Sequence, residues 1–242
     1  MKQGYDVFGK AYGVMMRNDL HDLKSIDHQF LRDMIRLDEE SYPMLYAHEP
    51  AQYNMNEHEL YPFALQFRGE SDHQTIENIL RYTANVAANC YDDFEEMKFG
   101  GTEKEILERG TDWCADMARV GAVLLMCNGI PARIVHLVNP DKAYNGHVVT
   151  EAFYEGKYGI CDFTYGRCFY DGKPLDAYEL MCHKQYLKNY SENYASLYSA
   201  VAINEYDPTD RNNDYTVSVP NQYYLTLINA NHNDTWIMGE DQ

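Results

Sequence analysis

The sequence predicts an α+β protein in which one buried helix packs on an antiparallel sheet. Residues 111–127 are apolar around most of a helical circumference, which is typical of a helix enclosed in a core. Three β-rich runs follow at 132–138, 147–154 and 157–164, and the last two are joined by a two-residue, glycine-containing link. With 242 residues, the chain is long enough for one substantial core.

The buried helix has a marked start and a marked end. Thr111 and Asp112 are good N-cap residues, and Asn128-Gly129 followed by Pro131 is a common way to end a helix. Cys114 therefore lies in the first turn, where unpaired N–H groups and the helix dipole favour a thiolate. The position makes Cys114 a candidate nucleophile, although a lone cysteine there can equally be a small buried residue.

The last two β-rich runs predict a hairpin. If Glu155-Gly156 is the loop, Val149 lies opposite Asp162. His147 and Asp162 then become diagonal neighbours on one face, roughly 5–8 Å apart at Cβ. A slip of one residue in the register would place them on opposite faces.

A cysteine at a helix start, with a histidine and an aspartate on paired strands, has the composition of an activated thiol nucleophile. Each member also has a simpler interpretation. His147 could be a strand histidine bound to a backbone carbonyl, and Asp162 could cap a turn at a strand end. The combination of all three favours the catalytic interpretation.

Several motifs around these residues resemble the core signature of the transglutaminase-like superfamily. They are Cys114-x-Asp116-x-Ala118, Leu124-Leu125, Gly129-Ile130-Pro131-Ala132-Arg133, His147 with Glu151 four residues on, and Asp162-Phe163-Thr164-Tyr165-Gly166. The spacing from Cys114 to Gly129 also fits the family. The resemblance covers about residues 75–180, and the segment from Cys114 to Arg133 is its most specific part.

The resemblance implies a papain-like α+β core, with Cys114 as nucleophile, His147 as base and Asp162 as the orienting acid. It requires no metal and no organic cofactor. The backbone N–H of Cys114 is the expected oxyanion donor. Trp113, Tyr165 and Glu151 are secondary candidates for oxyanion or substrate contacts.

The resulting hypothesis is cysteine-dependent acyl transfer through a thioacyl enzyme, from an amide or thioester donor to an amine or water. One alternative is a cysteine peptidase or amidase on the same scaffold. Another is a non-catalytic binding module that uses a tyrosine-rich face. The expected partners are a small-molecule or peptide acyl donor and an amine acceptor, and the oligomeric state is left open.

Charge and cysteine usage bound the setting. The net charge of −18 argues against nucleic acid and anionic membranes as main partners. The first 22 residues lack the apolar segment of a signal peptide, and no apolar run has the length of a membrane span. Six cysteines without CxxC spacing indicate reduced thiols rather than a metal or redox pair, so a cytoplasmic location is expected.

The flanking segments predict an N-terminal helical and loop extension over 1–70, a catalytic core over 71–185, and a C-terminal helix with strands over 186–242, all in one globular unit. Helices are expected over 21–37, 71–91 and 102–108, and after Asp176. Terminal strands are expected over 216–219, 223–227 and 235–238.

Tyrosines recur every four residues in the C-terminal segment, which predicts an aromatic stripe on one helix. The helix would pack this stripe against the core, with a substrate-stacking wall as the alternative. The residues concerned are Tyr186, Tyr190, Tyr194 and Tyr198.

Overall fold

The computed structural model describes residues 35–47, 49–88, 101–111, 113–139, 146–204 and 206–209. These residues form an α+β fold, as predicted, with a six-stranded antiparallel sheet in the order β1-β6-β2-β3-β4-β5. The strands are β1 (Ile35–Arg36), β2 (Ala132–Val138), β3 (Gly146–Tyr154), β4 (Lys157–Asp162), β5 (Arg167–Cys168) and β6 (Ala200–Asn204). The helices are α4 (Ser41–Tyr46), α5 (Tyr61–Ala64), α6 (Asp72–Ala88), α7 (Glu103–Arg109), α8 (Cys114–Cys127), α9 (Ala177–Cys182) and α10 (Glu192–Ser196), with 3-10 turns at Leu65–Phe67 and Lys184–Leu187.

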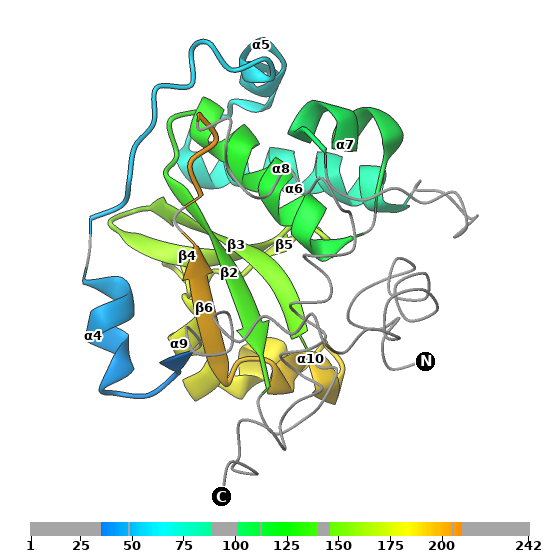
Figure 1. The fold of residues 1–242 in the computed structure, drawn as a ribbon. Helices are drawn as coiled ribbons and strands as arrows, with labels where there is room; N and C mark the ends of the chain where they lie inside the picture. The colour runs from blue at the N-terminus through cyan, green and yellow to red at the C-terminus, as the bar shows by residue number, and fades with distance from the viewer. Residues whose placement is uncertain are drawn as a thin grey trace, which may run out of the picture.

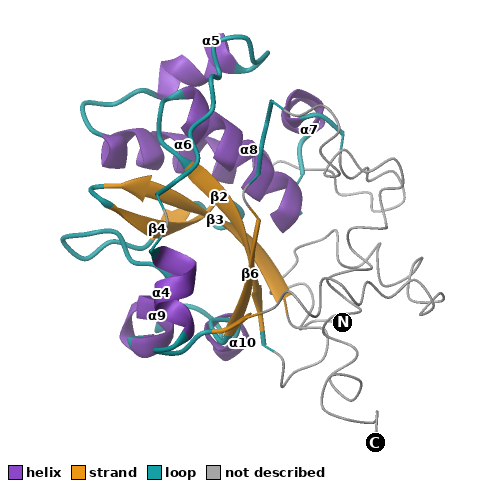
Figure 2. Ribbon diagram, turned by 60° about the vertical axis from the view of Figure 1, so that its left-hand side comes forward, coloured by secondary structure: helices purple, strands orange, loops and turns teal. Residues whose placement is uncertain are grey.

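The helices lie in two groups on either side of the sheet. Figure 1 shows α5 to α8 gathered above the strands, and α4, α9 and α10 below them. Figure 2 shows the same division after rotation. Helix α8 contacts β2 and β3 directly and is itself flanked by α5, α6 and α7, which explains why it is buried along its whole length.

The predicted hairpin and its register are confirmed. Tyr154 pairs with Lys157 and Thr150 pairs with Cys161, so the loop is Glu155-Gly156. Both loop residues have positive φ, 52° and 80°, which is the backbone of the tight turn that matches the twist of paired strands. The register places His147 and Asp162 on one face.

The predicted helix signals are also confirmed, with one shift. Thr102 caps α7 through a capping box, and Asp176 caps α9 in the same way. The N-cap of α8 is Trp113 rather than Thr111. Thr111 instead accepts a hydrogen bond of 3.0 Å from the Trp113 N–H, and Asp112 lies outside the described residues.

A glycine sets how closely β4 approaches α8. Phe163, directly after β4, packs on Gly121 in the middle of α8. A Cβ built on Gly121 would lie only 2.0 Å from the Phe163 ring, so no larger residue fits without moving the ring. Because Phe163 follows Asp162 in the chain, this contact also fixes the end of the strand that carries the candidate acid.

Replacing Gly121 by alanine is therefore expected to lower the free energy of unfolding by about 1–3 kcal/mol, through overpacking. Urea unfolding measures this loss. As a control, the same substitution is made in a Phe163→Leu variant. The smaller leucine side chain relieves the clash, so Gly121→Ala should lower the free energy of unfolding by less there. An equal loss in both backgrounds would contradict the packing argument.

Two expectations about the flanking segments are wrong. Residues 186–198 do not form one helix, because the chain turns at residues 188–190 and α10 begins afresh after Ser191. The helix expected over 21–37 does not extend to its predicted end, since Ile35–Arg36 is a strand. The rest of that helix, residues 89–91 of the helix expected over 71–91, and the terminal strands lie outside the described residues.

The sheet draws strands from all three sequence segments. Strand β6 was not predicted, yet it lies between β1 and β2 and pairs with both. In the described part of the chain, no helix is long and apolar enough to cross a membrane.

Candidate active site

Cys114 is the first residue of α8 and is fully buried. The first N–H groups of a helix have no acceptor inside it, and the side chain of the N-cap residue Trp113 makes no capping hydrogen bond. The N–H of Cys114 therefore points out of the helix start next to its own thiol. Such a group can donate to negative charge that develops on a substrate oxygen.

Two polar contacts hold the start of α8 against its neighbours. Arg109, the last residue of α7, forms an ion pair of 3.1 Å with Asp116 in the first turn of α8. On the other side, the Thr150 hydroxyl of β3 donates a hydrogen bond of 2.8 Å to the Ala118 carbonyl. The second contact fixes the helix that carries Cys114 relative to the strand that carries His147.

His147 and Asp162 form a buried hydrogen-bonded pair. The distance between His147 Nε2 and Asp162 Oδ2 is 2.8 Å, and neither side chain is exposed to solvent. Because a carboxylate only accepts, Nε2 carries the proton of this bond. The other ring nitrogen, Nδ1, has no nitrogen or oxygen partner among the described residues, while the side chains of Cys114 and His147 interact.

The surroundings of His147 favour its protonated form. Burial alone would lower its pKa, but the charge of Asp162 and its hydrogen bond, followed by the Cys114 side chain, raise the pKa to about 10. A protonated imidazole beside a thiol can stabilise the thiolate. The arrangement therefore favours an imidazolium next to the Cys114 side chain.

This raised pKa predicts how stability depends on pH. The folded protein keeps a proton on His147 that the unfolded chain releases above about pH 6.5. The stabilisation is thus fully present below about pH 6.5 and is lost as the pH rises to about 10. In urea unfolding, the difference in free energy of unfolding between wild type and His147→Gln should become smaller as the pH rises across this window. A difference that stays constant would contradict the raised pKa.

Asp162 is oriented by more than the histidine. Its Oδ1 accepts hydrogen bonds from the backbone N–H groups of Thr164 and Tyr165, both at 3.1 Å. Its Oδ2, besides accepting from His147, accepts a bond of 2.6 Å from the hydroxyl of Tyr194. The carboxylate therefore has four donors and a single orientation.

Tyr194 was predicted only as a member of the aromatic stripe, and the sequence did not indicate its hydrogen bond to Asp162. It lies on α10, is 1% exposed, and contacts the His147 ring at 5.5 Å between centroids. Burial, and then the charge of Asp162, raise its pKa well above the usual value, so its hydroxyl stays a donor. It stacks on Tyr190 at 4.4 Å, and its oxygen lies 3.1 Å from that of Tyr198.

Replacing Tyr194 by phenylalanine is expected to lower the free energy of unfolding by about 1–3 kcal/mol, because a buried carboxylate loses a donor. Tyr198→Phe is the matched control. It removes a hydroxyl from the same cluster, but that hydroxyl contacts Asp162 only through Tyr194. Urea unfolding should therefore show a smaller loss for Tyr198→Phe, and equal losses would remove the special role of Tyr194.

The three secondary candidates occupy different places. Tyr165 lies at the site, with its ring 5.6 Å from that of His147 and 37% of the residue exposed. Trp113 is buried before Cys114, and its backbone N–H is engaged by Thr111.

Glu151 is engaged elsewhere. It forms a buried ion pair of 2.7 Å with Arg133 and accepts a hydrogen bond of 2.7 Å from Tyr46. It lies four residues, or roughly 13 Å, along β3 from His147. Glu151 therefore links β3 to the neighbouring strand β2 and to α4, at a distance from the imidazole.

Comparison with known families bears on this geometry. Residues 63–163 match the sequence model of the family described as the Transglutaminase-like superfamily. This segment is similar to a transglutaminase-like core. This core runs from α5 to the residue after β4 and includes Cys114, His147 and Asp162. No curated protein and no solved structure matched the chain significantly.

Five cysteines of the described residues are free. Two of them are the first and last residues of α8, Cys114 and Cys127. Cys127, at the far end, is buried, and burial followed by the charge of Glu103 raises its pKa to about 12. Among the described residues, no group of histidine, cysteine and acidic side chains has the arrangement of a metal site. The two α8 thiols thus provide an internal comparison of environments.

Proposed function

We propose that this protein forms a thioacyl intermediate on Cys114 and passes the acyl group to an amine or to water. The observation that carries the proposal is the buried His147–Asp162 pair, whose free nitrogen is available to the Cys114 side chain at the start of α8. The transglutaminase-like core supports cysteine-dependent acyl transfer or hydrolysis in general. The proposal includes a papain-like arrangement, in which the helix that starts at Cys114 packs on the strand that carries His147.

In the first half of the reaction, the Cys114 thiolate attacks the carbonyl carbon of an amide, ester or thioester. The new C–S bond forms, and the carbonyl electron pair moves onto oxygen near the N–H of Cys114. When that carbonyl re-forms, the bond to the leaving nitrogen, oxygen or sulfur breaks. His147 gives its proton to the leaving group, which departs neutral.

In the second half, an amine or water attacks the thioacyl carbon. His147, now neutral, removes a proton from the attacking atom as the C–S bond breaks and the Cys114 thiolate is restored. Asp162 holds the imidazole in one tautomer and stabilises its charged form in both halves. Transfer and hydrolysis therefore differ only in the acceptor.

The test is acylation of the protein by a simple acetyl thioester, followed by intact-mass and peptide mass spectrometry. We expect one acetyl group on Cys114, and its transfer to added glycinamide in competition with release as acetate. Cys114→Ala should lose the adduct. Cys127→Ala, at the other end of the same helix, is the matched control and should retain it.

Failure of any acyl donor to modify Cys114, or equal labelling in the Cys114→Ala variant, would sink the proposed function. Because Cys114 is 0% exposed, thioesters with small acyl groups are the appropriate first probes. Their rate is compared with that of the denatured chain, in which all thiols are accessible. A native rate no higher than the denatured one would also count against the proposal.

A further inference from the structure

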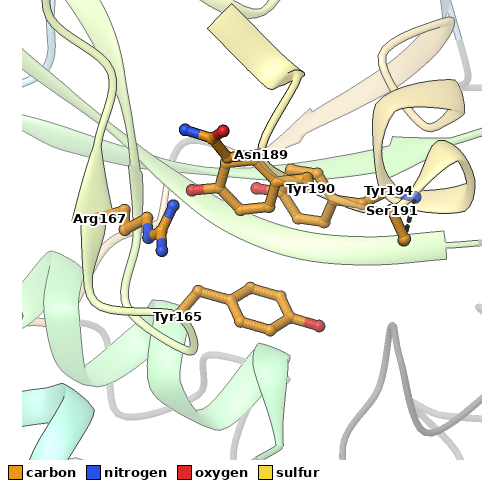
Figure 3. Close-up of a pocket in the computed structure, with 6 residues that line it drawn as sticks. All are labelled: Tyr165, Arg167, Asn189, Tyr190, Ser191 and Tyr194. Carbon is orange, nitrogen blue, oxygen red and sulfur yellow. Dashed lines mark hydrogen bonds between the residues drawn. The ribbon is translucent and has the colours of Figure 1, made fainter.

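A cavity of about 320 Å³ lies next to the two tyrosines, Tyr165 and Tyr194, that contact the imidazole of the candidate site. Its lining is formed by Tyr165, Arg167, Asn189, Tyr190, Ser191 and Tyr194. Figure 3 shows the rings of Tyr190 and Tyr194 across the opening from Tyr165, with the guanidinium of Arg167 at one end. Two of the lining rings, those of Tyr165 and Tyr194, contact the His147 ring.

The sheet register brings a positive charge to this cavity. Arg167 of β5 pairs directly with Asp162 of β4, which places their Cβ atoms about 5 Å apart on one face. The two side chains nevertheless form no ion pair, because the oxygens of Asp162 already accept four hydrogen bonds. The guanidinium turns instead over the ring of Tyr190, at 5.0 Å from its centroid.

Arg167 therefore presents a charge that the described part of the protein does not neutralise. No carboxylate among the described residues lies within ion-pair distance of it. A guanidinium held by a tyrosine face, with its donors directed to a cavity, is suited to bind a carboxylate.

Building on the thioacyl chemistry proposed above, we propose that this cavity binds a carboxylate on the leaving-group side of the substrate. The side follows from the proton transfer, because the leaving group must contact the imidazole that protonates it. The imidazole does not line the cavity itself, but two rings that do, those of Tyr165 and Tyr194, contact it. The ligand class is thus a carboxylate-bearing amine or thiol, such as the C-terminal residue of a peptide, and an acceptor amino acid would use the same contacts.

The tyrosines add a preference for a flat spacer. The ring of Tyr190 is occupied, because it stacks on Tyr194 and carries the guanidinium of Arg167. The ring of Tyr165, which is 37% exposed and meets Tyr190 edge to face at 6.3 Å, is the aromatic surface left for a ligand. A planar group between the scissile bond and the carboxylate can pack on the ring of Tyr165 while the carboxylate reaches Arg167. The amide of Asn189, at the rim, offers a further donor.

The test uses two thioesters that transfer the same acetyl group and differ only in one charge. They are the S-acetyl derivatives of 4-(mercaptomethyl)benzoate and 4-(mercaptomethyl)benzamide, and the readout is the rate of acetylation of Cys114 by mass spectrometry. We expect wild type to react about 10–100-fold faster with the carboxylate, the range for a hydrogen-bonded charge. Arg167→Met should bring the ratio of the two rates close to one.

Lys188→Met is the matched control, because it removes the same charge from an exposed residue that does not line the cavity. It should keep the preference. Equal rates with both probes in wild type, a preference that survives in Arg167→Met, or an equal loss in Lys188→Met would overturn the inference while leaving the thioacyl chemistry standing.

If neither probe acetylates Cys114, the proposed function fails, and the cavity is then tested by binding alone. Ligand-observed NMR compares 4-methylbenzoate with 4-methylbenzamide on wild type, Cys114→Ala and Arg167→Met. Binding of the benzoate only, lost in Arg167→Met and retained in Cys114→Ala, supports a carboxylate site that is independent of the chemistry. Absence of that pattern overturns it.

Discussion

Replacing His147 by alanine is expected to slow acetylation of Cys114 by about 10²–10⁴-fold at neutral pH, the usual contribution of a positioned acid–base group. Two effects combine in this loss. The thiolate loses the adjacent cation that stabilises it, and the leaving group loses its proton donor. Both follow from the buried imidazole whose pKa is raised by Asp162.

The rate is measured by mass spectrometry with a thioester donor, beside His136→Ala as control. His136 is also a buried histidine, on the neighbouring strand β2, and burial lowers its pKa to about 3, so it stays neutral. The His136→Ala variant therefore measures how much the rate falls from damaged packing alone, with no acid–base group lost. If the two variants are slowed equally, the effect of His147 is structural and its catalytic role is contradicted.

Asp162→Asn is expected to reduce turnover by about 10³–10⁴-fold while the fold is retained. Asparagine has the shape of aspartate but lacks the charge that does most to raise the pKa of His147. Its amide can also present a donor to the imidazole, which favours the wrong tautomer. The four hydrogen bonds that now converge on the carboxylate cannot all be kept by an amide oxygen.

Asp176→Asn provides the control for this substitution. Asp176 is equally buried, but it caps α9, where asparagine is as good a cap as aspartate. Its other charged partner is Lys157 at 3.3 Å, away from His147, so losing that ion pair does not touch the candidate site. The variant should therefore fold and turn over nearly as wild type does. A small effect of Asp162→Asn, comparable to that of Asp176→Asn, would mean that the carboxylate does not act through His147.

The helix, the hairpin and the three candidate catalytic residues could be predicted because their signals are local. The turn at Glu155-Gly156 determines the register, and the register alone brings His147 and Asp162 to one face. The caps at Thr102 and Asp176 are equally local, since each is set by a residue three positions later.

The rest of the site depends on contacts between distant segments. Tyr194 reaches Asp162 across 32 residues, and its four-residue spacing from Tyr190 suggested a continuous helix instead. The signal that could have corrected this was Ser191, whose hydroxyl accepts from the Tyr194 N–H and starts α10. Strand β6 is short and pairs only with distant strands, so its sequence carries no turn that indicates its partners.

The central claim, that His147 activates the thiol of Cys114, is tested most directly by alkylation with iodoacetamide, resolved by cysteine with mass spectrometry. Cys127 serves as the internal reference, because it is buried on the same helix and burial raises its pKa to about 12. We expect Cys114 to react well ahead of Cys127 at neutral pH in wild type, and this lead to shrink at least about tenfold in His147→Ala. Equal rates for the two thiols in wild type, or a lead that His147→Ala leaves unchanged, would contradict the activated pair.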